Sequence, residues 1–78
     1  MKVYTLTVDP NDYDNVPYLY GVYDSQKKAE QAIQENAIEE SEPALLLTHE
    51  YDTWECAECW HYPEYEYSRY YIREWEVE

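Results

Sequence analysis

The chain has 78 residues, of which 18 are acidic and 5 are basic, and its formal net charge is −13. This length allows one domain, residues 1–78, with a thin hydrophobic core. A hydrophobic content of 45% and an aromatic content of 18% argue against a disordered acidic tail. No apolar run reaches the ~18 residues of a membrane span, and residues 1–4 lack the apolar core of a signal peptide. We therefore expect a cytoplasmic protein that makes no membrane contact.

Two strands are predicted in the first third of the chain. Residues 2–8 alternate with a period of two and are rich in branched and aromatic side chains, which predicts a strand. Asp, Asn and Pro residues typical of turns fill positions 9–17, and residues 18–23 predict a second strand. This strand contains Gly21, the single glycine of the chain, which suggests a β-bulge or the close approach of another backbone.

A helix is predicted over about residues 25–37. Asp24 and Ser25 supply an N-cap, and the apolar residues that follow recur at helical spacing. These inward-facing residues are Ala29, Ala32, Ile33 and Ala37. Three of the four are alanine, so the helix can lie close to a sheet, and Pro43 disfavours helical geometry at Glu42.

The remaining predictions are strands. Residues 44–48 are the most apolar run, which favours a buried strand over a helical turn. Residues 62–78 alternate over much of their length and predict one strand with an irregularity near Ser68 and Arg69, or two strands. The predicted fold is α+β: a small antiparallel sheet of three to four strands with one helix on one face, in the order ββαββ.

The clearest local motif is the Cys-x-x-Cys pair of Cys56 and Cys59. With His61 and His49, the two thiolates could complete a tetrahedral zinc site. Structural zinc sites, however, usually pair such a motif with a second, distant couple of ligands. We therefore expect no cofactor, and zinc bound by these four residues remains the disfavoured alternative.

No catalytic residues are predicted. A redox role for the cysteines is disfavoured because the neighbouring Glu55 and Glu58 would raise the thiol pKa. We expect two reduced cysteines in a loop or turn, with the flanking tryptophans packed on the sheet. The chain has no glycine-rich phosphate loop and no legible Ser/His/Asp arrangement, and a paired-carboxylate hydrolase needs a deeper cleft than a thin domain offers. The protein is predicted not to be an enzyme.

The charge itself suggests a type of partner. Direct nucleic-acid binding is disfavoured, because such proteins depend on Lys and Arg to neutralise phosphates. The carboxylates are spread evenly, with nine in residues 1–42 and nine in residues 43–78. A folded surface of this kind would be steered to basic clefts that normally hold nucleic acid. The other interpretation is that the charge only keeps the protein soluble.

The candidate partner-binding residues combine carboxylates with tyrosine, a favoured interface residue. They are Asp9, Asp12, Asp14, Glu39, Glu40, Glu42, Glu64, Glu66, Tyr65 and Tyr67.

Three parts of the chain resemble small acidic phage-encoded proteins of unknown function. These parts are the first strand at residues 2–4, the segment 21–25 leading into the helix with Ala29, Ala32 and Ile33, and the closing segment 71–77. The resemblance implies a phage origin, a compact α+β fold and no inherited catalytic residues. In type, such a protein is similar to anti-CRISPR and antirestriction DNA-mimic inhibitors. The functional hypothesis is thus a non-enzymatic inhibitor of a host defence protein, and the alternative is a small structural or zinc-stabilised protein–protein adaptor that uses Cys56 and Cys59.

Overall fold

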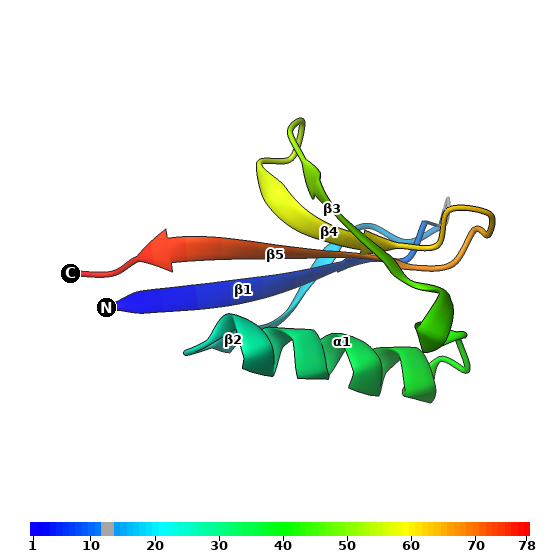
Figure 1. Cartoon of the computed structure of the whole chain (residues 1–78), viewed down its shortest axis with the longest axis horizontal. Coiled ribbons are helices and arrows are strands. Elements are labelled where there is room, and N and C mark those ends of the chain that lie inside the picture. Colours follow the sequence, from blue (N-terminus) through cyan, green and yellow to red (C-terminus); the bar gives the residue numbers. More distant parts are fainter. Residues whose placement is uncertain (12–13) are drawn as a thin grey trace.

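The computed structural model describes residues 1–11 and 14–78, which form an antiparallel sheet with a helix on one face (Figure 1). The elements in chain order are β1 (Lys2–Asp9), β2 (Tyr18–Tyr23), α1 (Gln26–Glu39), the short 3₁₀ helix η1 (Ala44–Leu46), β3 (Thr48–Asp52), β4 (Ala57–His61) and β5 (Arg69–Glu76). Across the sheet the strand order is β2-β1-β5-β4-β3. The first and last long strands, β1 and β5, therefore lie side by side at the centre.

The predicted fold was wrong in its number of strands, which was too low by at least one. Within the described residues the sheet has five strands in the order ββαβββ, instead of three to four in the order ββαββ. The unexpected strand is β4, which contains Cys59 and pairs with both β3 and β5. The turn before it contains no glycine. Asp52 accepts hydrogen bonds from the backbone N–H groups of Trp54 and Glu55, and Cys56 adopts a left-handed φ of 53°.

The prediction of a buried strand at residues 44–48 was also wrong. Pro43 leads into η1, and β3 begins only at Thr48. Leu45 is 99% exposed and Leu46 is half exposed, so Leu47 alone of the three leucines packs against the core. The chain must turn between α1 and β3, and this turn uses the residues whose apolar character suggested a strand. Residues 62–68 likewise form a loop, and β5 begins at Arg69.

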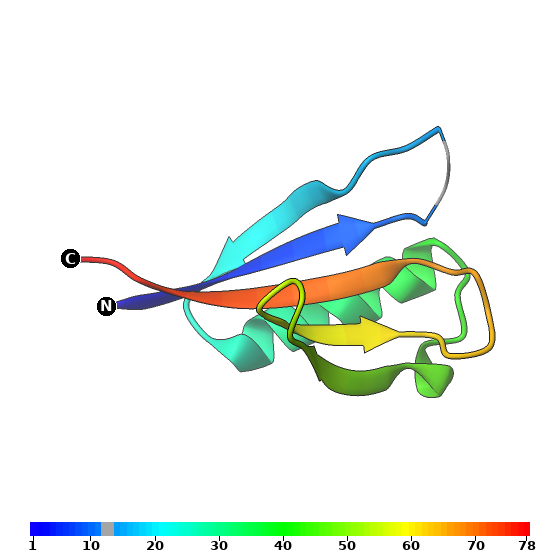
Figure 2. The same ribbon diagram turned by 90° about the horizontal axis from the view of Figure 1, so that it is seen from above.

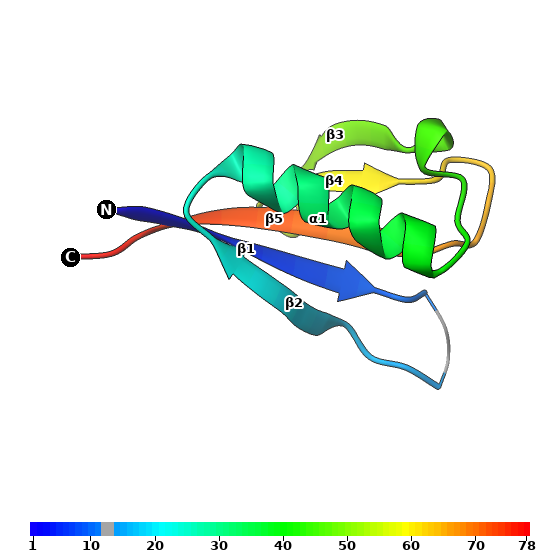
Figure 3. The ribbon, with the colours of Figure 1, turned by 90° about the horizontal axis from the view of Figure 1, so that it is seen from below.

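The helix prediction was confirmed. The Ser25 hydroxyl accepts a hydrogen bond from the Lys28 backbone N–H at 3.2 Å, and α1 runs from Gln26 to Glu39. The four apolar residues expected to face inward are all buried, together with Asn36. Figure 3 shows α1 lying across the middle of the sheet, where it contacts β1, β2 and β5.

The role of Gly21 was partly anticipated. Leu6 pairs with Gly21 and Thr7 with Leu19, so Tyr20 is the extra residue of a β-bulge in β2. The close approach is made by a side chain and not by another backbone. A Cβ atom on Gly21 would lie 2.5 Å from the hydroxyl oxygen of Tyr23. The absence of a side chain at Gly21 thus lets the Tyr23 ring pack against the core.

The two faces of the sheet are covered differently. The face under α1 holds the main core, which includes Leu6, Ile33, Trp60 and Tyr70. The opposite face has a small buried cluster of Ala57, Cys59 and Tyr71, where β4 of the β3–β4 hairpin pairs with β5. Of the elements in the described part of the chain, β3 contacts β4 alone, so β3 lies beyond the area that α1 covers.

Candidate functional site

Three segments that carry predicted binding residues lie at the same end of the molecule. They are the β1–β2 connection, the C-terminus of α1, and the loop between β4 and β5. Figures 1 and 2 show all three at the end of the sheet opposite the N- and C-termini. We call this region the acidic end and define it by the carboxylates of Asp9, Asp14, Glu39, Glu40, Glu64 and Glu66. Asp12, also predicted, lies outside the described residues.

The protein's own basic groups are located mostly elsewhere. Lys2 and the N-terminus pair with Glu74 and Glu76 at the opposite end, and Lys28 pairs with Asp24 before α1. Arg73 pairs with Glu55 of the β3–β4 turn at 3.0 Å. In the part of the chain that the structure describes, no ion pair involves Glu39, Glu40, Glu64 or Glu66. The negative charge of the acidic end is therefore less neutralised within the protein than the charge at the other end.

Aromatic side chains form part of the same end. Tyr65 and Tyr67 are exposed, and their ring centroids lie 5.7 Å apart. Tyr67 also packs edge-on against the buried ring of Tyr62 at 5.0 Å. These contacts hold two exposed tyrosines in a fixed position beside Glu64 and Glu66, which lowers the entropy cost of using them in an interface.

Glu42 differs from the other predicted binding residues because the protein uses its carboxylate internally. One oxygen accepts hydrogen bonds from the Ser68 backbone N–H at 3.1 Å and from the Ser68 hydroxyl at 2.9 Å. The other accepts from the hydroxyl of Tyr70 at 2.8 Å. Asn36 of α1 donates to the same tyrosine oxygen at 2.8 Å. Glu42 therefore links the segment after α1 to the start of β5, and few of its lone pairs are left to accept hydrogen bonds from a partner.

A shallow, open depression of about 590 Å³ lies between the β1–β2 connection and the β4–β5 loop. Its lining includes Asn11, Glu64, Glu66 and Arg69. Arg69 pairs across the sheet with Asp9, whose carboxylate accepts a hydrogen bond from the Asn11 backbone N–H. Arg69 is the one Lys or Arg side chain among the described residues that line this depression, and His61 lines it as well. The six carboxylates that define the acidic end outnumber these basic groups.

The predicted zinc ligands do not gather. Cys56 is exposed in the β3–β4 turn, whereas Cys59 is buried in the cluster on the open face of the sheet. His49 stacks on Trp60 at 4.2 Å and its Nε2 lies 2.6 Å from Glu58, while His61 pairs with Glu50 at 3.3 Å. No three His, Cys, Asp or Glu side chains in residues 1–11 and 14–78 are arranged to hold a metal ion.

The cysteine pair also differs from the expected loop. Cys59 belongs to β4, and burial, followed by the negative charge of Asp52, raises the pKa of its thiol to about 11. Of the flanking tryptophans, Trp60 packs in the core, but Trp54 is almost fully exposed. A buried thiol of raised pKa is a poor nucleophile and a poor metal ligand at neutral pH.

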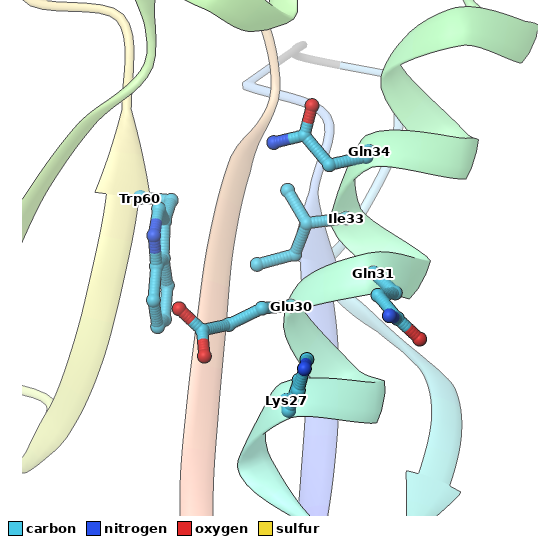
Figure 4. Close-up of a pocket in the computed structure, with 6 residues that line it drawn as sticks. All are labelled: Lys27, Glu30, Gln31, Ile33, Gln34 and Trp60. Atoms are coloured by element: carbon cyan, nitrogen blue, oxygen red, sulfur yellow. The ribbon is translucent and has the colours of Figure 1, made fainter.

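A second hollow lies between α1 and β4, with a volume of about 270 Å³. Figure 4 shows Ile33 and the ring of Trp60 on opposite sides of it, with the Glu30 carboxylate turned toward Trp60. Lys27 also lines the hollow and adds a positive charge to it. The hollow thus has mixed charge and lacks the cluster of convergent polar groups expected of a small-molecule site.

Comparison with known proteins assigns the chain to a family. A family model described as "Domain of unknown function (DUF7336)" matches residues 1–78. The chain belongs to the DUF7336 family. The search of curated proteins and of solved structures produced no match. The description of DUF7336 names no activity and no phage origin, so the resemblance to phage proteins stays a prediction.

Sequence reasoning missed one feature of this DUF7336 domain near the acidic end. Leu46, Pro63, Glu64 and Tyr65 line a small apolar depression of about 180 Å³. The side chains come from η1 and from the β4–β5 loop, so they meet only after folding. The sequence signal was the Leu-Leu-Leu run, which we interpreted as a core strand.

The DUF7336 domain contains no candidate membrane-spanning helix in its described residues, since α1 is too short and too polar to cross a bilayer.

Proposed function

We propose that the protein is a non-enzymatic inhibitor that binds a basic, nucleic-acid-handling surface of a host defence protein, as anti-CRISPR and antirestriction mimics of nucleic acid do. In this proposal it is phage-encoded and acts in the host cytoplasm. The acidic end supplies the contact, with Tyr65 and Tyr67 as aromatic anchors. It takes the place of nucleic acid, so it competes with phosphates for the same Lys and Arg side chains.

The observation that carries the proposal is the gathering of separate acidic segments. Three segments far apart in the sequence bring their carboxylates to one end, and Glu39, Glu40, Glu64 and Glu66 make no ion pair there within the described residues. Packing like charges together destabilises a fold unless something else offsets the repulsion. A basic partner would relieve the repulsion on binding.

The zinc-stabilised adaptor has less support. Its four proposed ligands lie in different environments, two of them engaged with glutamate side chains and one buried. No observation on the described residues favours it over the inhibitor.

A displacement assay tests the proposal. The protein is added to purified restriction endonucleases and CRISPR nucleases that hold a fluorescently labelled DNA duplex, and release of the duplex is followed by polarisation. We expect displacement from at least one effector, weakened strongly between about 50 and about 300 mM salt because the contact is electrostatic.

Two double variants, each of which removes two negative charges, test whether the acidic end makes the contact with the effector. Glu64→Gln with Glu66→Gln should weaken displacement by about tenfold, since each lost charge faces the basic surface. Glu74→Gln with Glu76→Gln removes the same charge from the opposite end and should have little effect. Equal effects of the two pairs, or displacement that is insensitive to salt, would contradict the proposed site.

A further inference from the structure

The outer strand β2 is unusual in this highly charged protein. Its sequence is Tyr-Leu-Tyr-Gly-Val-Tyr, and it is the one strand of the described sheet that contains no charged residue. It also stands at the edge of the sheet, with β1 on one side and no strand of the described chain on the other. Edge strands usually carry charged side chains or proline, which discourage the addition of another strand. Of these protective devices, β2 has only the bulge at Tyr20. A bulge increases the local twist of a strand.

The two sides of this edge have different chemistry. On the face away from α1, Leu19 is 60% exposed and Val22 is 56% exposed. They pair with Thr7 and Thr5 of β1, so this side is apolar to neutral.

On the face toward α1 the edge is negatively charged. Glu35 and Glu39 lie one helical turn apart on α1, which packs against β2. Both carboxylates are close enough to β2 that, after burial, their charge raises the pKa of Tyr20. Lys28 is engaged with Asp24 at 2.8 Å, so it does not neutralise them.

We propose that an extended, basic segment of a partner protein adds to the outer edge of β2 as a sixth strand. Backbone hydrogen bonds would supply the affinity. Alternate side chains of an added strand point to opposite faces, so its Lys or Arg residues would face Glu35 and Glu39 and its apolar residues would cover Leu19 and Val22. The inference rests on the proposed function in one respect, that the partner is basic.

Charge argues against a second copy as the occupant. Pairing two β2 edges would bring the glutamates of both helices to the same seam, with no described basic side chain placed to neutralise them. Like charges opposite each other destabilise a sheet, whereas a basic strand relieves the repulsion.

A pair of peptides of identical composition tests the inference. One heptapeptide, with blocked ends, alternates lysine and valine, and its isomer places the lysines and valines in two blocks. Each is titrated into ¹⁵N-labelled protein. We expect the alternating peptide to shift the amide signals of β2 and slow their hydrogen exchange, and to bind about tenfold more tightly than the block isomer.

Variants separate this contact from the acidic end. Glu35→Gln with Glu39→Gln should weaken the alternating peptide by about three- to tenfold, while Glu64→Gln with Glu66→Gln should leave it unchanged. Equal binding of the two peptides, shifts confined to residues 62–68, or a dimer that forms through β2 and excludes the peptide would overturn the inference. Peptide binding requires no defence protein, so failure here and failure of DNA displacement are separate results.

Discussion

At the residue scale, Glu42 shows how one carboxylate among eighteen can differ from the rest. It accepts three hydrogen bonds from Ser68 and Tyr70, and Tyr70 is a fully buried side chain of the core. Neighbouring Glu39 and Glu40 are exposed and make no ion pair within the described chain. All three were predicted from the sequence to bind a partner. A hydrogen-bonded, partly buried carboxylate stabilises the fold, whereas an exposed carboxylate is available to a partner.

Substitution of Glu42 should therefore reduce stability. Glu42→Ala leaves the hydroxyls of Ser68 and Tyr70 and one backbone N–H without their acceptor, at a cost of about 2–3 kcal/mol in the free energy of unfolding. Glu42→Gln keeps one carbonyl acceptor and should cost less. Urea unfolding followed by tryptophan fluorescence measures both, with Glu40→Ala as the exposed control. A loss no larger than that of Glu40→Ala would show that the network contributes little.

At the element scale, β2 depends on the single glycine of the chain. The bulge at Tyr20 and the ring of Tyr23 folded over Gly21 let Tyr20 and Tyr23 both pack against the core from a six-residue strand. A residue with a Cβ at position 21 would have to move the Tyr23 ring, which is half-buried.

Gly21→Ala should thus destabilise the protein by about 1–2 kcal/mol through overpacking. In a Tyr23→Ala background the same substitution should cost much less, because the obstructing ring is gone. A double-mutant cycle from thermal or urea unfolding gives the coupling energy. Equal costs in the two backgrounds would mean that the Tyr23 ring is not what requires glycine at this position.

The β3–β4 hairpin shows why one element was missed at this scale. Ala57–His61 alternates between the two faces, but this short segment also carries Cys59 of the Cys-x-x-Cys pair, a spacing that is equally typical of a metal site. Its turn also lacks the Asn-Gly or Asp-Gly signal of tight hairpins, because Asp52 and the left-handed Cys56 shape it instead. A hairpin whose turn lacks these dipeptides is difficult to predict from its local sequence.

For the molecule as a whole, the buried tyrosines make the stability of the fold depend on pH. Burial, with the negative charge of Glu42 as a further cause, raises the pKa of Tyr62 to about 12 from the ordinary value of 10.0. Burial also raises the pKa of Tyr70 above its ordinary value. Their phenols hold their protons more tightly in the folded state than in the unfolded state.

Stability should therefore fall in alkali. Below pH 10 these tyrosines are protonated in both states, and their contribution to stability is fully present. As the pH rises from 10 to about 12, the unfolded state releases protons that the folded state keeps, so the free energy of unfolding decreases, by at most about 1.4 kcal/mol per pH unit for each tyrosine. Urea unfolding at several pH values measures this, and Tyr62→Phe should reduce the slope. A stability that is flat to pH 12 would contradict it.

The features that depend on residues close together in the chain could be predicted before the structure was known. The Ser25 cap and the spacing of Ala29, Ala32, Ile33 and Ala37 specify α1, because capping and helical periodicity act within a few residues. The alternation of residues 2–8, the second strand at residues 18–23 and the net charge of −13 could also be predicted from the sequence, although the bulge at Tyr20 interrupts the alternation of β2. The tertiary structure alone decided the strand order, the internal role of Glu42, the neutral edge at β2 and the gathering of three acidic segments at one end. The physical reason is that these features depend on which distant segments pair, and pairing is set by how the whole chain buries its apolar surface.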